Sequence, residues 1–151
     1  MPDQPTLDLS VILPVYDEES NLEPLHQELT ETLGPLGCSY EIVAVDDGSQ
    51  DHSFEVLSGL AQSDPHLRII RFRRNFGQSA SFAAGFDHAR GAIVLTMDAD
   101  GQNDPADIPA LLDEMERGNF DMVNGWRLNR QEPFLTRRFP SMVANALIGR
   151  T

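Results

Sequence analysis

The chain has 151 residues, of which 40% are hydrophobic and 23% charged, which is typical of one globular domain with its own core. No apolar run reaches the ~18–20 residues that a membrane span needs, and residues 1–4 are not expected to begin a signal peptide. The net charge of −13 argues against general nucleic-acid binding, and the single cysteine, Cys38, cannot form an intramolecular disulfide, which is typical of a reducing cytoplasm.

The charge is distributed unevenly along the chain. Residues 126–151 carry five arginines and one glutamate, a net charge of +4, whereas residues 1–125 carry six arginines and 23 acidic residues, a net charge of −17. A basic segment attached to an acidic body indicates local contact with phosphate groups or with an anionic surface.

Strands and helices are predicted to alternate along residues 9–125. Apolar runs of strand length predict strands at residues 9–13, 40–45, 67–72 and 92–97, and a short fifth one at 121–125. Helical periodicity predicts helices at residues 20–33, around 54–61, at 78–90 and at 104–118. The first should begin with a capping box at residues 20–23, the third is rich in small residues, and the last is opened by Asp104 and Pro105. The alternation predicts right-handed crossovers and a parallel sheet, the α/β class.

Acidic residues follow three of the predicted strands. They are Asp17 and Glu18, Asp46 and Asp47, and Asp98 and Asp100. Because the carboxyl ends of parallel strands share one edge, these side chains should lie close together, where like charges repel unless a cation is present. Asp98 and Asp100, followed by Gly101, could offer oxygen ligands to one divalent cation.

Other α/β enzyme classes lack their motifs in this chain. No Gly-x-Gly-x-x-Gly follows the first strand, the absence of lysine excludes a phosphate loop of the Gly-Lys-Ser/Thr type, and no Gly-x-Ser-x-Gly nucleophile elbow occurs. The four histidines have neither zinc-site spacing nor the spacing of a catalytic pair.

The segment after residue 125 has a different pattern. Its apolar residues recur at near-helical spacing with arginines between them: Phe134, Leu135, Phe139, Met142, Val143, Ala146 and Leu147. A basic amphipathic helix on a membrane surface and an ordinary helix packed on the domain account for this pattern equally well. Because the chain ends within the apolar pattern, we expect it to be truncated.

Five ordered motifs resemble those of family 2 glycosyltransferases, in the polyprenyl-phosphate branch of dolichol-phosphate mannose synthase and GtrB-like enzymes. The motifs are residues 14–18 (PVYDE), 46–49 (DDGS), 74–77 (RNFG), 98–102 (DADGQ) and 125–127 (GWR). The resemblance implies a GT-A fold, a mainly parallel sheet flanked by helices, C-terminally incomplete in this chain. Residues 1–125 would form the nucleotide-sugar-binding core and 126–151 the start of the acceptor and membrane-surface region.

The resemblance also implies roles for residues of the first two motifs. Pro14, Tyr16 and Glu18 would line the nucleotide pocket, with Tyr16 against the base. Asp46 and Asp47 would bind base and ribose, in an order that stays open.

The later motifs carry the implied metal and phosphate contacts. Asp98 and Asp100 would bind Mg²⁺ or Mn²⁺ at the donor diphosphate, and Gln102 occupies the position that contacts the donor and metal region. Arg127 and Arg130 would hold the phosphate of the acceptor or of the leaving group.

The resemblance also concerns the membrane-surface helix, one departure from the family's first motif, and a later motif that this chain lacks. Arg137, Arg138 and Ser141 fall in the family's membrane-surface helix, and Asp17 stands where the family usually has Asn, a replacement that we expect to be tolerated. The family's later acidic and cysteine-containing motif has no counterpart in this chain.

The implied activity is inverting transfer of a sugar from a UDP- or GDP-sugar to a polyprenyl phosphate such as undecaprenyl or dolichyl phosphate. It would take place at the cytoplasmic face of the plasma membrane, to which the protein would be peripheral. One alternative is transfer to a sugar hydroxyl of a polysaccharide or glycolipid. Another is a non-catalytic nucleotide-sugar-binding fragment. The sequence distinguishes neither donor base nor oligomeric state.

Overall fold

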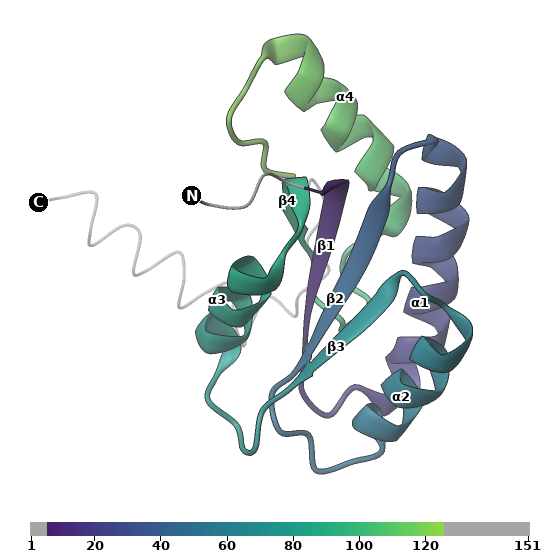
Figure 1. Ribbon diagram of the computed structural model, residues 1–151, viewed down its shortest axis with the longest axis vertical. Coiled ribbons are helices and arrows are strands. Elements are labelled where there is room, and N and C mark those ends of the chain that lie inside the picture. The colour runs from purple at the N-terminus through teal and green to yellow at the C-terminus, as the bar shows by residue number, and fades with distance from the viewer. Residues whose placement is uncertain (1–5, 126–151) are drawn as a thin grey trace, which may run out of the picture.

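A parallel four-stranded sheet with helices on both faces forms the part of the chain that the computed structural model describes, residues 6–125 (Figure 1). The strands are β1 (Leu7–Val15), β2 (Tyr40–Asp46), β3 (Leu67–Arg71) and β4 (Gly91–Thr96), in the order β3-β2-β1-β4. The helices are α1 (Glu19–Leu33), α2 (Ser53–Ser63), α3 (Gln78–His88) and α4 (Ile108–Gly118), with 3₁₀ turns η1 (Gly34–Leu36) and η2 (Pro105–Asp107). The predicted parallel α/β architecture is confirmed.

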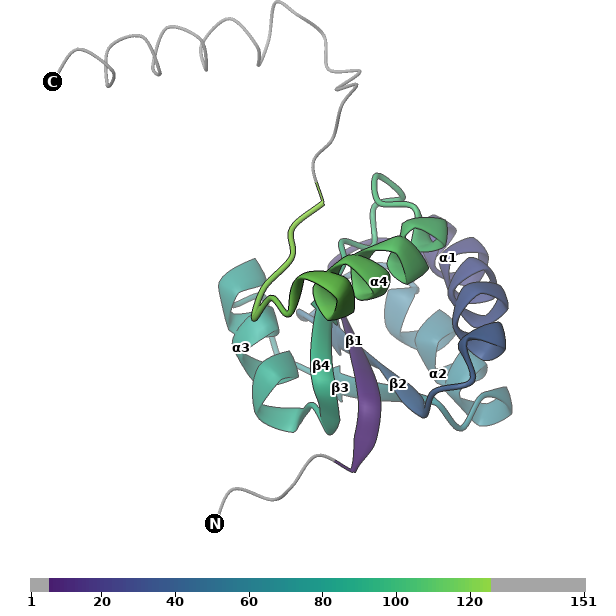
Figure 2. The same ribbon diagram turned by 90° about the horizontal axis from the view of Figure 1, so that it is seen from above.

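The helices divide between the two faces of the sheet. Helices α1 and α2 cover one face and α3 covers the other, while η2 and the start of α4 lie against α1 (Figures 1 and 2). Every residue of the inner strand β2 is buried, whereas half-buried and exposed residues alternate along β4. No helix within residues 6–125 is both long and apolar enough to cross a membrane.

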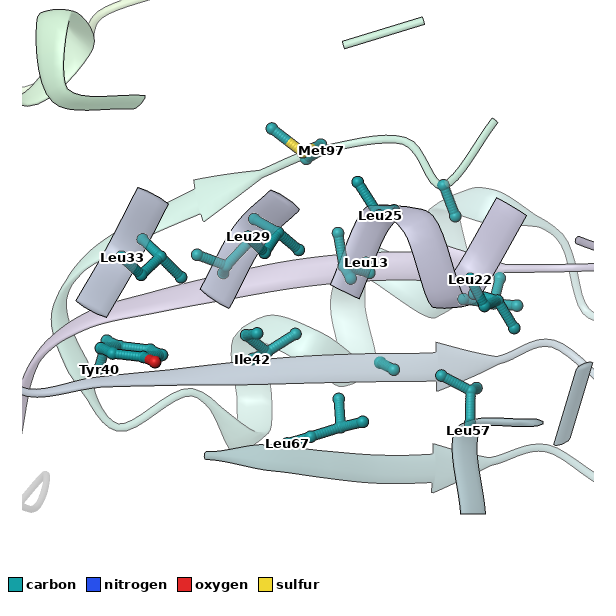
Figure 3. Packing of buried hydrophobic residues seen from close by; sticks show 14 of the residues in the cluster. Leu13, Leu22, Leu25, Leu29, Leu33, Tyr40, Ile42, Leu57, Leu67 and Met97 are labelled. Atoms are coloured by element: carbon teal, nitrogen blue, oxygen red, sulfur yellow. The ribbon is translucent and has the colours of Figure 1, made fainter. Parts of the chain in front are cut away.

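The leucines of α1 form the centre of the core. Leu22, Leu25, Leu29 and Leu33, which share one helical face, are at most 4% exposed and lie over β1 and β2 (Figure 3). Burial of each such side chain contributes roughly 1.5–3 kcal/mol, so this stripe is the main apolar contact that holds α1 on the sheet. The periodicity that predicted the helix also identified its buried face.

Helix α3 approaches the other face of the sheet closely. A Cβ atom at Gly85 would collide with the side chain of Ile12 on β1. Ser81, one turn earlier on the same face of the helix, is also fully buried. The small residues of this helix therefore bring its first turn against the carboxyl end of β1.

A buried glutamate, Glu41, connects the strands near their amino ends, away from the carboxyl end of β1. The Glu41 side chain accepts hydrogen bonds from Ser10 Oγ at 2.7 Å, Arg68 Nη1 at 2.6 Å and the Arg90 backbone N–H at 2.7 Å. Burial alone would raise its pKa, but the hydrogen bonds from Arg68, Ser10 and Arg90 together lower the pKa of Glu41 below its ordinary value. This network joins β1, β2, β3 and the turn before β4.

The predicted fifth strand at residues 121–125 is wrong. These residues form no strand, and Met122 is 83% exposed. An apolar pattern predicts burial, but a strand also needs a hydrogen-bonding neighbour, and none lies beside this segment in the part of the chain described. In the same part, β4 is an edge strand, and its Val94 is 38% exposed.

The predicted capping box at the start of α1 is also wrong. The helix begins at Glu19, so Ser20 lies inside its first turn. The backbone N–H of Glu18 donates to Ser53 Oγ at 2.9 Å, and that of Glu19 donates to Asp51 Oδ2 at 3.1 Å. Side chains from the loop before α2 and from its first residue thus satisfy the start of α1, which no local sequence pattern could reveal. The predicted cap at Asp104 is present, since its side chain accepts the Ala106 N–H at 2.9 Å, but it caps the 3₁₀ turn η2, and α4 begins only at Ile108.

Candidate active site

A cleft of about 390 Å³ lies at the carboxyl ends of β1, β2 and β4. Its lining includes the sequence-predicted residues Pro14, Tyr16, Glu18, Asp47, Asp98 and Asp100. Residues separated by more than eighty positions in the chain therefore meet at one edge of the sheet, as the parallel topology requires. Val15 and Ala99 complete the lining from β1 and the turn after β4, together with four residues to which no site role was assigned: Asn75 and Gly77 of the 74–77 motif, and Gln78 and Ser81 of α3.

Other sequence-predicted residues lie elsewhere. Asp46 is fully buried and is not part of the cleft lining; its Oδ1 accepts the Ser49 N–H at 3.0 Å. Its Oδ2 lies 3.3 Å from Arg71 Nε, a close charge pair without the alignment of a hydrogen bond. Gln102 is exposed and does not line the cleft, although its backbone N–H donates to Asp100 Oδ1 at 3.0 Å.

The predicted phosphate-binding arginines, Arg127 and Arg130, lie outside the described residues, as do Arg137, Arg138 and Ser141. The predicted amphipathic segment at 126–151 lies outside them too.

Asp17 shapes the loop between β1 and α1. It has a φ of +54°, a left-handed conformation in which Asp and Asn are enriched among non-glycine residues. Its carboxylate accepts the Gln50 N–H at 2.7 Å, and its own N–H donates to Ser49 Oγ at 3.1 Å. Asn also adopts this conformation and also offers a side-chain oxygen, so Asp here keeps the properties that the position needs. The two loops are thereby joined beside Tyr16, which is 40% exposed at the rim of the cleft.

Asp47 fixes the loop before α3. Its Oδ1 accepts the Phe76 N–H at 2.7 Å and its Oδ2 accepts the Gly77 N–H at 2.8 Å. Gly77 has φ +95° and ψ 158°, a backbone conformation that is essentially restricted to glycine. This conformation turns the chain into α3 at the point where the loop lines the cleft.

The two carboxylates after β4 are held differently. Gln78 Nε2, from the first residue of α3, donates to Asp98 Oδ1 at 2.7 Å. Asp100 is exposed and uses its Oδ1 within its own turn. The cleft therefore presents two carboxylates close in sequence, one of them oriented by a neighbouring helix.

The two aspartates suit a cation that takes its remaining ligands from a bound substrate and from water. Within residues 6–125, no group of three or more His, Cys, Asp or Glu side chains is arranged to hold a metal ion. Mg²⁺ is usually bound through one or two carboxylates together with substrate phosphates and water, so two aspartates match this pattern. Glu18, Asp47, Asp98 and Asp100 make the cleft strongly acidic, and an anionic ligand would be repelled unless a cation accompanied it.

The sequence comparisons identify relatives along almost the whole chain. A model of glycosyl transferase family 2 matches residues 10–150. A dodecaprenyl-phosphate galacturonate synthase of Rhizobium johnstonii is 40% identical over 146 residues, 96% of this chain and 43% of that protein. An undecaprenyl-phosphate 4-deoxy-4-formamido-L-arabinose transferase of Salmonella paratyphi B is 41% identical over 148 residues, 97% of this chain and 45% of that protein. The chain thus spans less than half the length of these relatives.

Solved structures share the fold. S. aureus TarS 1–349 matches with a TM-score of 0.59 and 21% identity, covering 82% of this chain and 38% of that one. The mannosyltransferase PcManGT from Pyrobaculum calidifontis, in complex with GDP-Man and Mn²⁺, matches with a TM-score of 0.54 and 26% identity, covering 71% and 32%. These matches and the strand order confirm the predicted GT-A fold. Since the family model matches residues 10–150, nearly the whole chain, and the relatives are 40–41% identical, the chain belongs to glycosyl transferase family 2.

Proposed function

We propose that the protein is an inverting glycosyltransferase that moves a sugar from a nucleotide diphosphate sugar to a polyprenyl phosphate. The observation that carries the proposal is that Asp98, Asp100, Tyr16 and Asp47 all line the same cleft. The names of the two relatives each contain a polyprenyl phosphate, which supports this acceptor class.

The nucleotide would occupy the side of the cleft formed by the ends of β1 and β2. Tyr16, exposed at the rim, is available to contact the base, and Pro14 and Glu18 line the same side. Of the two aspartates after β2, Asp47 is the candidate for ribose or base contact, because it lines the cleft and Asp46 does not.

The diphosphate would lie beside Asp98 and Asp100. Mg²⁺ or Mn²⁺ held by these two carboxylates would supply positive charge to the leaving nucleotide diphosphate. The presence of Mn²⁺ in the PcManGT structure supports this choice of cation. Gln78 would keep Asp98 oriented through its amide, and Gln102 would lie next to Asp100.

The acceptor would be held from the segment after residue 125. A phosphate oxygen of the polyprenyl phosphate would form a bond to the anomeric carbon while the bond from that carbon to the diphosphate breaks. An anionic phosphate nucleophile needs little help from a general base, whereas a sugar hydroxyl needs one. Arg127 and Arg130 would stabilise the phosphate charges, and residues 126–151 would contact the inner face of the membrane.

An acceptor assay tests this function. The full-length protein would be supplied with UDP- or GDP-sugars and Mn²⁺, and offered either undecaprenyl phosphate in detergent or free oligosaccharides. We expect sugar transfer only to the lipid phosphate, and we expect Arg127→Ala and Arg130→Ala to lower it by one to two orders of magnitude. Transfer to oligosaccharide hydroxyls would replace the proposed acceptor class. Nucleotide-sugar binding without any transfer would indicate a non-catalytic binding protein.

A further inference from the structure

The hydroxyl of Ser81 is an unpaired polar group in the lining of the cleft. Ser81 is 0% exposed, and its Oγ has no hydrogen-bond partner within residues 6–125. A buried hydroxyl without a partner destabilises a fold, and few natural structures keep one without a reason. An alanine at this position would pack equally well in the helix, so packing does not account for the serine.

Within residues 6–125, the first turn of the helix that carries Ser81 also has backbone N–H groups without a partner. Helix α3, of eleven residues, begins after Gly77, which has no side chain to cap it. The N–H groups of Ala80 and Ser81 both donate to the Gly77 carbonyl, which leaves those of Gln78 and Ser79 to be satisfied from outside the helix. These N–H groups carry the partial positive charge of a helix N-terminus, to which phosphate oxygens bind readily.

The position of Ser81 in the fold explains its burial. It lies one turn before Gly85, on the helix face that contacts β1, and it shares the cleft lining with Pro14 and Val15 at the end of that strand. It therefore forms part of the floor of the cleft. The position of a serine hydroxyl depends on one side-chain torsion, so a change of rotamer can turn it toward an oxygen that enters the cleft.

We propose that Ser81 binds the nucleotide sugar: its hydroxyl, together with the first-turn N–H groups of α3, donates hydrogen bonds to an oxygen of the nucleotide diphosphate. This inference rests on the proposed function and adds a contact from the helix to the same ligand. The group bound is a phosphate rather than a neutral sugar hydroxyl, because the hydroxyl and the N–H groups all supply donors at the positive end of a helix. The contact places the diphosphate between α3 and the Asp98–Asp100 turn.

Calorimetry with matched variants tests this assignment. The full-length wild type, Ser81→Ala and the control Ser58→Ala would be titrated with UDP, GDP and their sugar conjugates in the presence of Mn²⁺. The Ser58 hydroxyl donates to its own helix, at Phe54 O, away from the cleft. We expect Ser81→Ala to weaken binding about tenfold, equally for nucleoside diphosphates and nucleotide sugars. Its Tm should be unchanged or higher, and Ser58→Ala should bind like the wild type.

Each other outcome overturns the assignment. Unchanged affinity of Ser81→Ala would show that its hydroxyl contacts no part of the donor. A loss confined to nucleotide sugars would place the contact at the sugar instead of the diphosphate. A lower Tm for Ser81→Ala would mean that the hydroxyl has a partner within the fold. If the wild type binds none of the nucleotides, the proposed function itself fails and this inference falls with it.

Discussion

Asp47 at the end of β2 and Gly77 at the start of α3 are joined by a hydrogen bond of 2.8 Å from the glycine N–H to the Asp47 Oδ2. The other oxygen of the same carboxylate accepts the Phe76 N–H at 2.7 Å. One aspartate therefore both lines the cleft and holds the loop that delivers Gln78 and Ser81 to it. The position of α3 relative to the acidic strand ends depends on this carboxylate.

Replacement of Asp47 by Asn should loosen this loop. An amide offers one oxygen and one NH₂ group, so one of the two backbone N–H groups would face a donor. We expect Asp47→Asn to lower the free energy of unfolding by roughly 1–3 kcal/mol, measured by urea denaturation. The exposed Asp87→Asn on α3 is the control and should change stability by less than about 0.5 kcal/mol. Equal stability of both variants would contradict the role given to Asp47.

Replacement of Gly77 by Ala should strain the entry to α3. A side chain at φ +95° and ψ 158° costs of order 1–3 kcal/mol, although nothing lies within 4 Å of the position that the added Cβ would occupy. The matched control is Gly59→Ala in α2, where there is also open space and a helical backbone, and where alanine should stabilise by roughly 0.5–1 kcal/mol. Thermal unfolding of the two variants should therefore shift in opposite directions. A shift in the same direction would disagree with the geometry at Gly77.

Gln78 should act as a positioning residue for Asp98. Loss of its 2.7 Å hydrogen bond in Gln78→Ala leaves the carboxylate free to rotate. Removal of an outer partner of a metal ligand typically weakens metal affinity by about 10–100-fold, and we expect a loss in this range for Mn²⁺ in the presence of nucleotide. Gln27→Ala on α1 removes an exposed amide that bonds only within its own helix and is the control. Mn²⁺ titration followed by electron paramagnetic resonance measures the effect, and equal affinities would exclude this role.

The sequence allowed prediction of the residues that gather in the cleft but not of the bonds that arrange them. Periodicity identified the α1 leucines, and the acidic strand ends identified Asp47, Asp98 and Asp100, because both signals are local and parallel topology brings strand ends together. Ser81 and Gln78 could not be found in this way, since their significance arises from contacts with β1 and with Asp98. The contacts of Asp46 with Ser49 and Arg71, outside the cleft lining, could not be predicted from the motif either.

Glu41 should make stability depend on pH in the acid range. Its pKa is lowered in the folded state, so the stabilisation from its charged form is present above the unfolded pKa, about 4.3, and is lost as pH falls through the folded pKa. Glu41→Gln should cost roughly 1–3 kcal/mol at pH 7, and its difference from the wild type should shrink below about pH 4. Glu55→Gln, at an exposed position of α2, is the control. Urea denaturation at several pH values measures this, and a constant difference would contradict the assignment.

Titration calorimetry with nucleotide sugars and Mn²⁺ tests most directly whether the acidic cleft binds a donor through a cation. The full-length wild type should bind a UDP- or GDP-sugar in the presence of Mn²⁺ and lose most of that affinity when the ion is removed by EDTA. Asp98→Asn and Asp100→Asn should each reduce Mn²⁺-dependent binding by at least about tenfold, while the control Asp113→Asn on α4 should not. Equal binding by all four proteins, with or without Mn²⁺, would contradict the central claim.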